Sequence, residues 1–153
     1  MTRKKLREHL FVMLFRVDFH QKEELEEQIS IYLDEIENAS KKARTELRER
    51  FYAVVEHMEE IDKLIEEKAE GWALRRMAKA DVTVLRLATY ELLFDDQVPT
   101  GVAINEAVEL SKLYGTDKST SFINGVLATI AREQQKDSPD AVEGDRTAGQ
   151  GEE

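Results

Sequence analysis

The sequence predicts an all-α protein, and three observations lead to this prediction. The 153 residues contain only seven Gly and two Pro, so few residues interrupt regular structure. Apolar residues recur three and four positions apart over most of the chain, which is the period of an amphipathic helix. No stretch shows the strict apolar–polar alternation that is typical of a half-buried strand. We therefore expect about seven helices packed as a compact single-domain bundle.

The apolar pattern places three helices in the first half of the chain. They are predicted over residues 4–19, 23–37 and 41–69. The buried face of the first helix is defined by Leu6, Leu10, Met13 and Val17. Ser40 is placed to cap the third helix, whose apolar residues form one long heptad-like stripe. Gly71 is expected to end that helix region.

The second half of the chain is predicted to hold a short helical turn and three further helices. These elements are expected at residues 72–77, 80–94, 101–114 and 117–134. The helix at 80–94 is apolar around most of its circumference and should be central. Thr100 is expected to cap the next helix and Gly115 to end it. Gly125 lies inside the last helix, where Gly costs about 1 kcal/mol relative to Ala, so we expect tight helix packing there.

Composition changes sharply after residue 134. Residues 135–153 contain almost no large apolar side chains, which predicts a disordered acidic tail behind a helical domain over residues 1–134. The whole chain carries a formal net charge of -10, whereas its first twenty residues hold five Lys or Arg against two acids. The single positive block of an acidic protein is therefore its first helix.

Several classes of protein are excluded or disfavoured by the sequence. The chain has no Cys, which excludes disulfides and thiolate chemistry and suits the cytoplasm. No run approaches the roughly 18 apolar residues of a membrane span. The opening is not a signal peptide, because Arg16 interrupts a short apolar run and no small-residue cleavage site follows. No phosphate-binding loop, paired His ligands or activated nucleophile is present, so we expect no enzyme activity, metal or cofactor.

The basic opening has two interpretations on pattern alone. Its four cations, Arg3, Lys4, Lys5 and Arg7, cannot all share one helical face. They could form the solvated end of an ordinary amphipathic helix, which the pattern favours. They could instead contact the phosphates of a nucleic acid, with Phe15 offering a flat surface to an unstacked base.

Two blocks of the C-terminal half resemble the NusB family of bacterial transcription antitermination factors. They are "WALRRMAKADVTVLRLATYELLF", residues 72–94, and "VPTGVAINEAVELSKLYGTDKSTSFINGVLATIA", residues 98–131. The resemblance implies an all-helical fold of two three-helix groups. It also implies binding of boxA, a single-stranded element in ribosomal RNA leaders, and a heterodimer with the ribosomal protein NusE. Together these would join RNA polymerase with other Nus factors and suppress premature termination.

The resemblance also implies which residues contact RNA. The matching positions are Arg3, Lys4, Lys5, Arg7, Phe15, Asp81, Lys118 and Phe122. Lys118 stands where some members of the family carry an acid, which would alter one base contact. The surface for NusE is expected on the helices at 80–94 and 101–114. An alternative hypothesis is a helical protein–protein scaffold, or a homodimer that buries the basic helix and never touches RNA.

Overall fold

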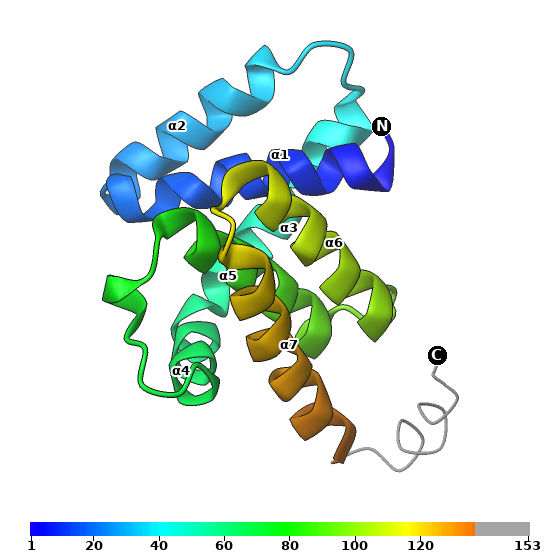
Figure 1. The fold of residues 1–153 in the computed structure, drawn as a ribbon. Coiled ribbons are helices and arrows are strands. Elements are labelled where there is room, and N and C mark those ends of the chain that lie inside the picture. Colours follow the sequence, from blue (N-terminus) through cyan, green and yellow to red (C-terminus); the bar gives the residue numbers. More distant parts are fainter. Residues whose placement is uncertain (137–153) are drawn as a thin grey trace. The chain divides into compact units, whose positions relative to one another are not determined.

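The computed structural model describes residues 1–136, which divide into two compact units. The first unit is Met1–Glu59, and the second begins at Glu60. All regular structure in the described residues is helical, with seven α-helices and two short 3-10 helices (Figure 1). The all-α prediction is confirmed. The predicted tail lies outside the described residues, apart from positions 135 and 136, which continue the last helix.

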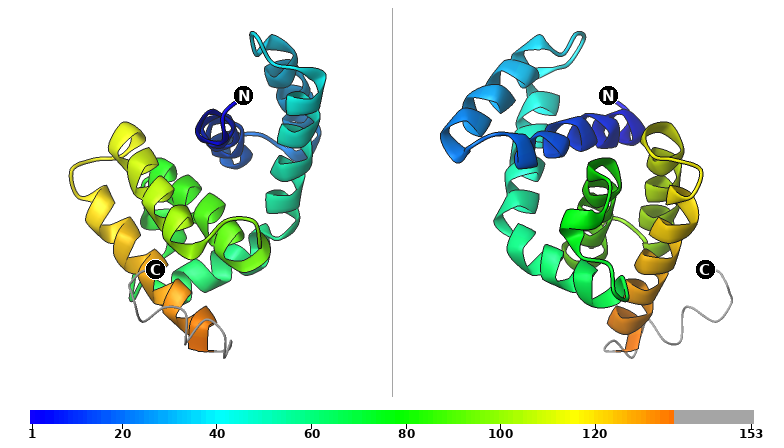
Figure 2. Two further views of the ribbon diagram at one scale, coloured as in Figure 1. Left: turned by 90° about the vertical axis from the view of Figure 1, so that its right-hand side faces the viewer. Right: turned by 60° about the vertical axis from the view of Figure 1, so that its left-hand side comes forward.

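The first unit contains three α-helices, of which the third contacts both of the others. Its elements are α1 (Arg3–Phe15), the 3-10 helix η1 (Arg16–Phe19), α2 (Lys22–Glu35) and α3 (Lys41–Glu56). Both α1 and α2 pack against α3, and Figure 2 shows α1 running across α3 rather than along it. The buried side chains include Leu6, Leu10, Met13, Leu25, Ile29, Leu33, Leu47 and Phe51. Ser40 caps α3 as predicted, because its hydroxyl accepts a hydrogen bond from the Ala43 N–H at 3.0 Å.

The predicted long helix over residues 41–69 is wrong, because it divides at His57. The backbone of His57 (φ -99°, ψ 8°) leaves the helical region, and its N–H donates to the Val54 carbonyl at 3.1 Å. Such an i to i−3 bond tightens and ends a helix. A new helix, α4 (Met58–Lys68), then leads into the second unit. Periodicity could not reveal the break, because the apolar spacing stays at three and four residues across it.

The second unit contains α4 followed by a group of three α-helices, as the resemblance implied. After α4 come the 3-10 helix η2 (Leu74–Arg76), α5 (Lys79–Phe94), α6 (Thr100–Tyr114) and α7 (Ser119–Lys136). Helices α5, α6 and α7 contact one another in every pairing. Every residue from 82 to 89 is buried, which confirms the prediction that this helix is central. Pro99, not Thr100, occupies the cap position of α6, and Gly115 follows its last residue as predicted.

Gly71 has φ +86°, a conformation that L side chains rarely adopt, and it follows the end of α4 as predicted. No helix within residues 1–136 is long and apolar enough to cross a membrane.

The prediction of tight packing at Gly125 is wrong. A Cβ added to Gly125 would meet no atom within 4 Å, and the residue is exposed on α7. We therefore expect Gly125→Ala to raise the free energy of unfolding by about 1 kcal/mol, because Ala restricts the unfolded chain and favours the helix. Chemical denaturation followed by circular dichroism measures this change.

At Gly115, unlike at Gly125, an added side chain would collide with neighbouring atoms. A Cβ at this position would lie 2.5 Å from the Ser119 Oγ and 2.8 Å from the Ser111 carbonyl oxygen. Gly115→Ala should therefore lower the free energy of unfolding, by about 1–3 kcal/mol as for other overpacked sites. Equal effects of the two substitutions would contradict both assignments.

Candidate nucleic-acid interface

The first turn of α1 presents three exposed cations, Arg3, Lys4 and Lys5. The helix begins there because the Thr2 hydroxyl accepts a hydrogen bond from the Lys5 N–H at 3.1 Å. No acidic residue lies in this turn, although the positive end of a helix dipole favours acids and disfavours cations. The cations therefore do not stabilise their own helix. Together with the dipole they form a positive terminus that suits an anion such as phosphate.

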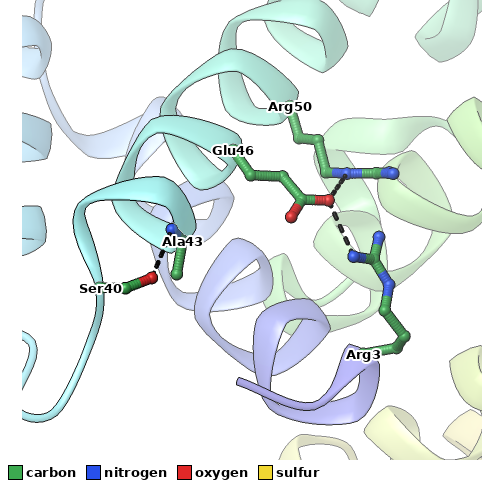
Figure 3. A network of polar contacts seen from close by, with 5 residues as sticks. All are labelled: Arg3, Ser40, Ala43, Glu46 and Arg50. Carbon is green, nitrogen blue, oxygen red and sulfur yellow. Dashed lines mark hydrogen bonds and ion pairs between the residues drawn. The ribbon is translucent and has the colours of Figure 1, made fainter.

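Two of these cations pair with carboxylates of the first unit. Arg3 Nη1 donates to Glu46 Oε2 at 2.8 Å, and Arg50 Nε donates to the same oxygen at 3.0 Å (Figure 3). Lys5 Nζ lies 3.5 Å from Glu8 Oε1. The hydrogen bond from Arg3 is the largest cause that lowers the pKa of Glu46, and it acts against the opposite effect of burial. Glu46 is therefore ionised at neutral pH.

Arg7 differs from the other three cations, because it is only 9% exposed. The expectation that it faces RNA is not supported by this position. Arg7 shares a helical face with Phe11 and Leu14, at spacings of four and seven residues, and both of these are buried. The clustering of four cations within five positions of the sequence did not reveal that the fourth one turns to the buried face. Its long aliphatic stem can pack there while its charge is satisfied by polar partners.

Phe15 lies at the end of α1 in a row of three aromatic rings. It is half-buried between Phe11, at 6.2 Å between ring centroids, and Phe19, at 5.1 Å. Phe19 is 56% exposed and is the more accessible flat surface of the two. Sequence reasoning did not select Phe19, although its spacing of four residues from Phe15 was available as a signal.

His9, also on α1, adds no positive charge to this region at neutral pH. Its Nδ1 lies 2.6 Å from the Tyr32 hydroxyl, and the two rings meet edge-on. Burial is the first cause that lowers the pKa of His9, and the nearby charge of Lys5 lowers it further. The positive potential of this helix therefore comes from its first turn and not from its middle.

The second unit also carries accessible aromatic and basic residues. Phe122 on α7 is half-buried and meets the ring of Trp72 edge-on, at 6.3 Å between centroids. Trp72 is 53% exposed, and Lys118, which precedes α7, is also exposed. Arg75 and Arg76 in η2 are exposed as well. Sequence reasoning selected Phe122 and Lys118 but not Trp72, although an aromatic residue followed closely by two arginines is a usable signal.

Asp81 lies in the first turn of α5, where the helix dipole favours a carboxylate. Its Oδ1 is buried and has no hydrogen-bond partner among the described residues. That oxygen is not accessible to a ligand, so only the remainder of this half-buried carboxylate could contact RNA.

Helix α5 presents less surface to a protein partner than the sequence predicted. The middle of this helix is buried, so only its ends can present side chains to a partner. Helix α6 offers more, because Val102, Leu113 and Tyr114 are exposed apolar side chains. Within residues 1–136 no group of three or more His, Asp or Glu could hold a metal ion.

Comparisons with known proteins match most of this chain to one family. Residues 4–132 match the NusB family. The transcription antitermination protein NusB of Agathobacter rectalis is 53% identical over 131 residues, which cover 86% of this chain and 100% of that protein. The solved structure of Thermotoga maritima NusB is 41% identical, with a TM-score of 0.79, and the match covers 87% of this chain and 92% of that one. A structure described as the antitermination factors NusB and NusE in complex with double-stranded RNA is 29% identical, with a TM-score of 0.72, covering 86% and 96% of the two chains.

Proposed function

Because the chain belongs to the NusB family, we propose that it is a transcription antitermination factor that binds boxA-type RNA through the first turn of α1. The observation that carries this proposal is the exposure of Arg3, Lys4 and Lys5 at the positive end of their helix. Cations in that position destabilise the helix slightly and attract phosphate. An ordinary solvated helix end would gain nothing from them.

The exposed aromatic residues favour single-stranded RNA as the ligand. Phe19 and Trp72 each expose a large part of a flat ring, and an unpaired base can stack on such a ring. A base inside a duplex cannot do so without leaving its pair. Phe15 and Phe122 are half-buried, and each contacts one of these two rings through the aromatic contacts described above.

The partner of the proposed complex is NusE. The solved relative described as NusB and NusE in complex with double-stranded RNA matches 86% of this chain, which supports a similar assembly with NusE here. The exposed apolar side chains of α6 provide a candidate surface for it. The complex would act in the cytoplasm on RNA polymerase with other Nus factors, as an adaptor and not as an enzyme.

Binding of boxA RNA tests the proposal directly. Replacing Arg3, Lys4 and Lys5 together by Ala should weaken binding by about a hundredfold, because three charge-assisted contacts of roughly 1 kcal/mol each are removed. The slope of log K against log salt concentration should also become shallower by about 2. Each phosphate contact with a single strand contributes about 0.7 to this slope. Fluorescence anisotropy of a labelled boxA RNA, measured at several salt concentrations, reports both quantities.

A matched control separates local contacts from total charge. Lys41, Lys42 and Lys63 are also exposed, so their joint replacement by Ala removes the same charge elsewhere. If both triple variants lose the same affinity, the first turn of α1 has no special role. If NusE adds nothing to the affinity of the wild-type protein, the proposed partnership is wrong.

The alternative function is a helical scaffold or homodimer that does not bind RNA. It is favoured by one observation, the exposed apolar side chains of α6, which would suit a protein partner of any kind. Light scattering of the free protein and ultraviolet crosslinking to RNA, mapped by peptide, distinguish the two functions. Crosslinks at Phe15, Phe19, Trp72 or Phe122 would exclude the scaffold.

A further inference from the structure

Glu46 on α3 forms an ion pair with Arg3, the first cation of the proposed RNA site on α1. Arg3 and Glu46 are 43 positions apart in sequence and meet because α1 crosses α3. The contact uses one terminal nitrogen of the Arg3 guanidinium and one oxygen of the carboxylate (Figure 3). It is therefore a single bond of the planar fork and not the two parallel bonds of a full pair.

Arg50 keeps the carboxylate of Glu46 in place. It lies one turn further along α3 and donates to the same Oε2 atom, at 3.0 Å. The Arg50 side chain is less exposed than that of Arg3, so Arg50 is the inner partner and Arg3 the outer one. Glu46 would thus keep a neighbour with opposite charge even if Arg3 moved away.

A phosphate oxygen and a carboxylate oxygen make the same kind of charge-assisted bond with a guanidinium. The Arg3 side chain is 60% exposed and that of Glu46 is 33% exposed, so an incoming phosphate can reach the pair. Exposed ion pairs contribute little to stability, so a phosphate contact can replace this one. The carboxylate also repels a phosphate that approaches Arg3.

We propose that Glu46 is an intramolecular competitor for RNA phosphate at Arg3, which lowers the affinity of the first turn of α1 for any polyanion. This inference rests on the proposed function, because it concerns the same site. A ligand must displace Glu46 before the Nη1 donor of Arg3 can bind its phosphate. The competition lowers the affinity for every polyanion by a similar factor. RNA that makes additional base contacts therefore stays bound at concentrations at which contacts with phosphate alone are too weak.

The test compares Glu46→Gln with Glu49→Gln in the full chain. Glu49 lies on α3 in the turn that follows Glu46 and is exposed, so its replacement removes the same charge without removing a partner of Arg3. Two labelled probes are used, boxA RNA and a uridine homopolymer of the same length. Thermal unfolding by circular dichroism checks that both variants remain folded, which is expected because exposed ion pairs contribute little to stability.

Glu46→Gln should bind both probes roughly two- to fivefold more tightly than Glu49→Gln does, which is the range that an exposed ion pair allows. The slope of log K against log salt should steepen by about 0.7, corresponding to one additional phosphate contact. A similar gain for both probes is expected, because phosphate contacts carry no sequence information.

A second pair of variants identifies the released cation. In an Arg3→Gln background, Glu46→Gln should add no more affinity than Glu49→Gln adds. If the gain persists without Arg3 and disappears in an Arg50→Gln background, Arg50 is the released group and the inference about Arg3 is overturned. Equal binding by the Glu46 and Glu49 variants, or weaker binding by the Glu46 variant, would also overturn it.

The experiments distinguish failure of the proposed role of Glu46 from failure of the proposed function. If the triple Ala variant at Arg3, Lys4 and Lys5 binds boxA RNA like the wild-type protein, the proposed function fails and this inference fails with it. If that triple variant is weakened while the Glu46 and Glu49 variants remain equal, only the role of Glu46 is refuted.

Discussion

Replacing Asp62 by Ala is expected to lower the free energy of unfolding by about 2–4 kcal/mol, because it removes the carboxylate from a buried guanidinium. Arg86 on α5 donates from Nε to Asp62 Oδ1 and from Nη2 to Oδ2, both at 2.8 Å. The Arg86 side chain is 7% exposed and that of Asp62 is 28% exposed. The partial exposure of Asp62 places the expected loss toward the lower part of the range for buried pairs.

Urea denaturation of the full chain measures this loss, with Glu67→Ala as the matched control. Glu67 is an exposed acid on the same helix, and its replacement should change the free energy of unfolding by no more than about 0.5 kcal/mol. Asp62→Asn should fall between the two, because an amide offers one acceptor where the carboxylate offers two. Equal stability of the Asp62 and Glu67 variants would show that the pair does not stabilise the packing of α4 on α5.

Phe51→Ala is expected to lower the free energy of unfolding by about 3–5 kcal/mol, the typical cost of removing a buried aromatic side chain. Phe51 has no exposed surface, and it lies on α3, the helix against which both α1 and α2 pack. The cavity left by the ring would therefore affect the contacts of all three helices in the first unit. Phe51→Leu retains most of the apolar volume and should cost less than about 1.5 kcal/mol.

The Phe51 variants also connect stability with the proposed site. Glu46 and Arg50 precede Phe51 on the same helix, so loosening of α3 would also disturb the ion pairs that Glu46 makes with Arg3 and Arg50. Differential scanning calorimetry, together with RNA titration below the transition, follows both effects. A Phe51→Ala protein with wild-type stability would contradict the assignment of α3 as the centre of the first unit.

The helices themselves could be predicted because their causes are local. Apolar spacing, the Ser40 cap and the left-handed Gly71 each depend on residues within one or two turns of the chain. The central position of α5 was also predictable, since a helix that is apolar around most of its circumference must be buried. The break at His57 was not, because the same apolar period continues through it.

The candidate site shows the same division between local and distant causes. Sequence placed a cluster of cations at the start of the first helix, and Arg3, Lys4 and Lys5 are indeed exposed there. It could not show that Arg7 turns to the buried face, or that Glu46 and Arg50 would lie beside Arg3. Nor could it show that Trp72 would meet Phe122, which lies fifty residues later in the chain.

The sequence by itself determined the all-helical class, most helix ends and the location of positive charge, because these follow from the chemistry of neighbouring residues. The tertiary structure decided which cations remain available, which rings are accessible and which carboxylate competes for Arg3. These properties depend on side chains that are distant in sequence and meet only when helices cross. Helix periodicity specifies which face is apolar, but it contains no information about which polar residue of another helix will lie opposite.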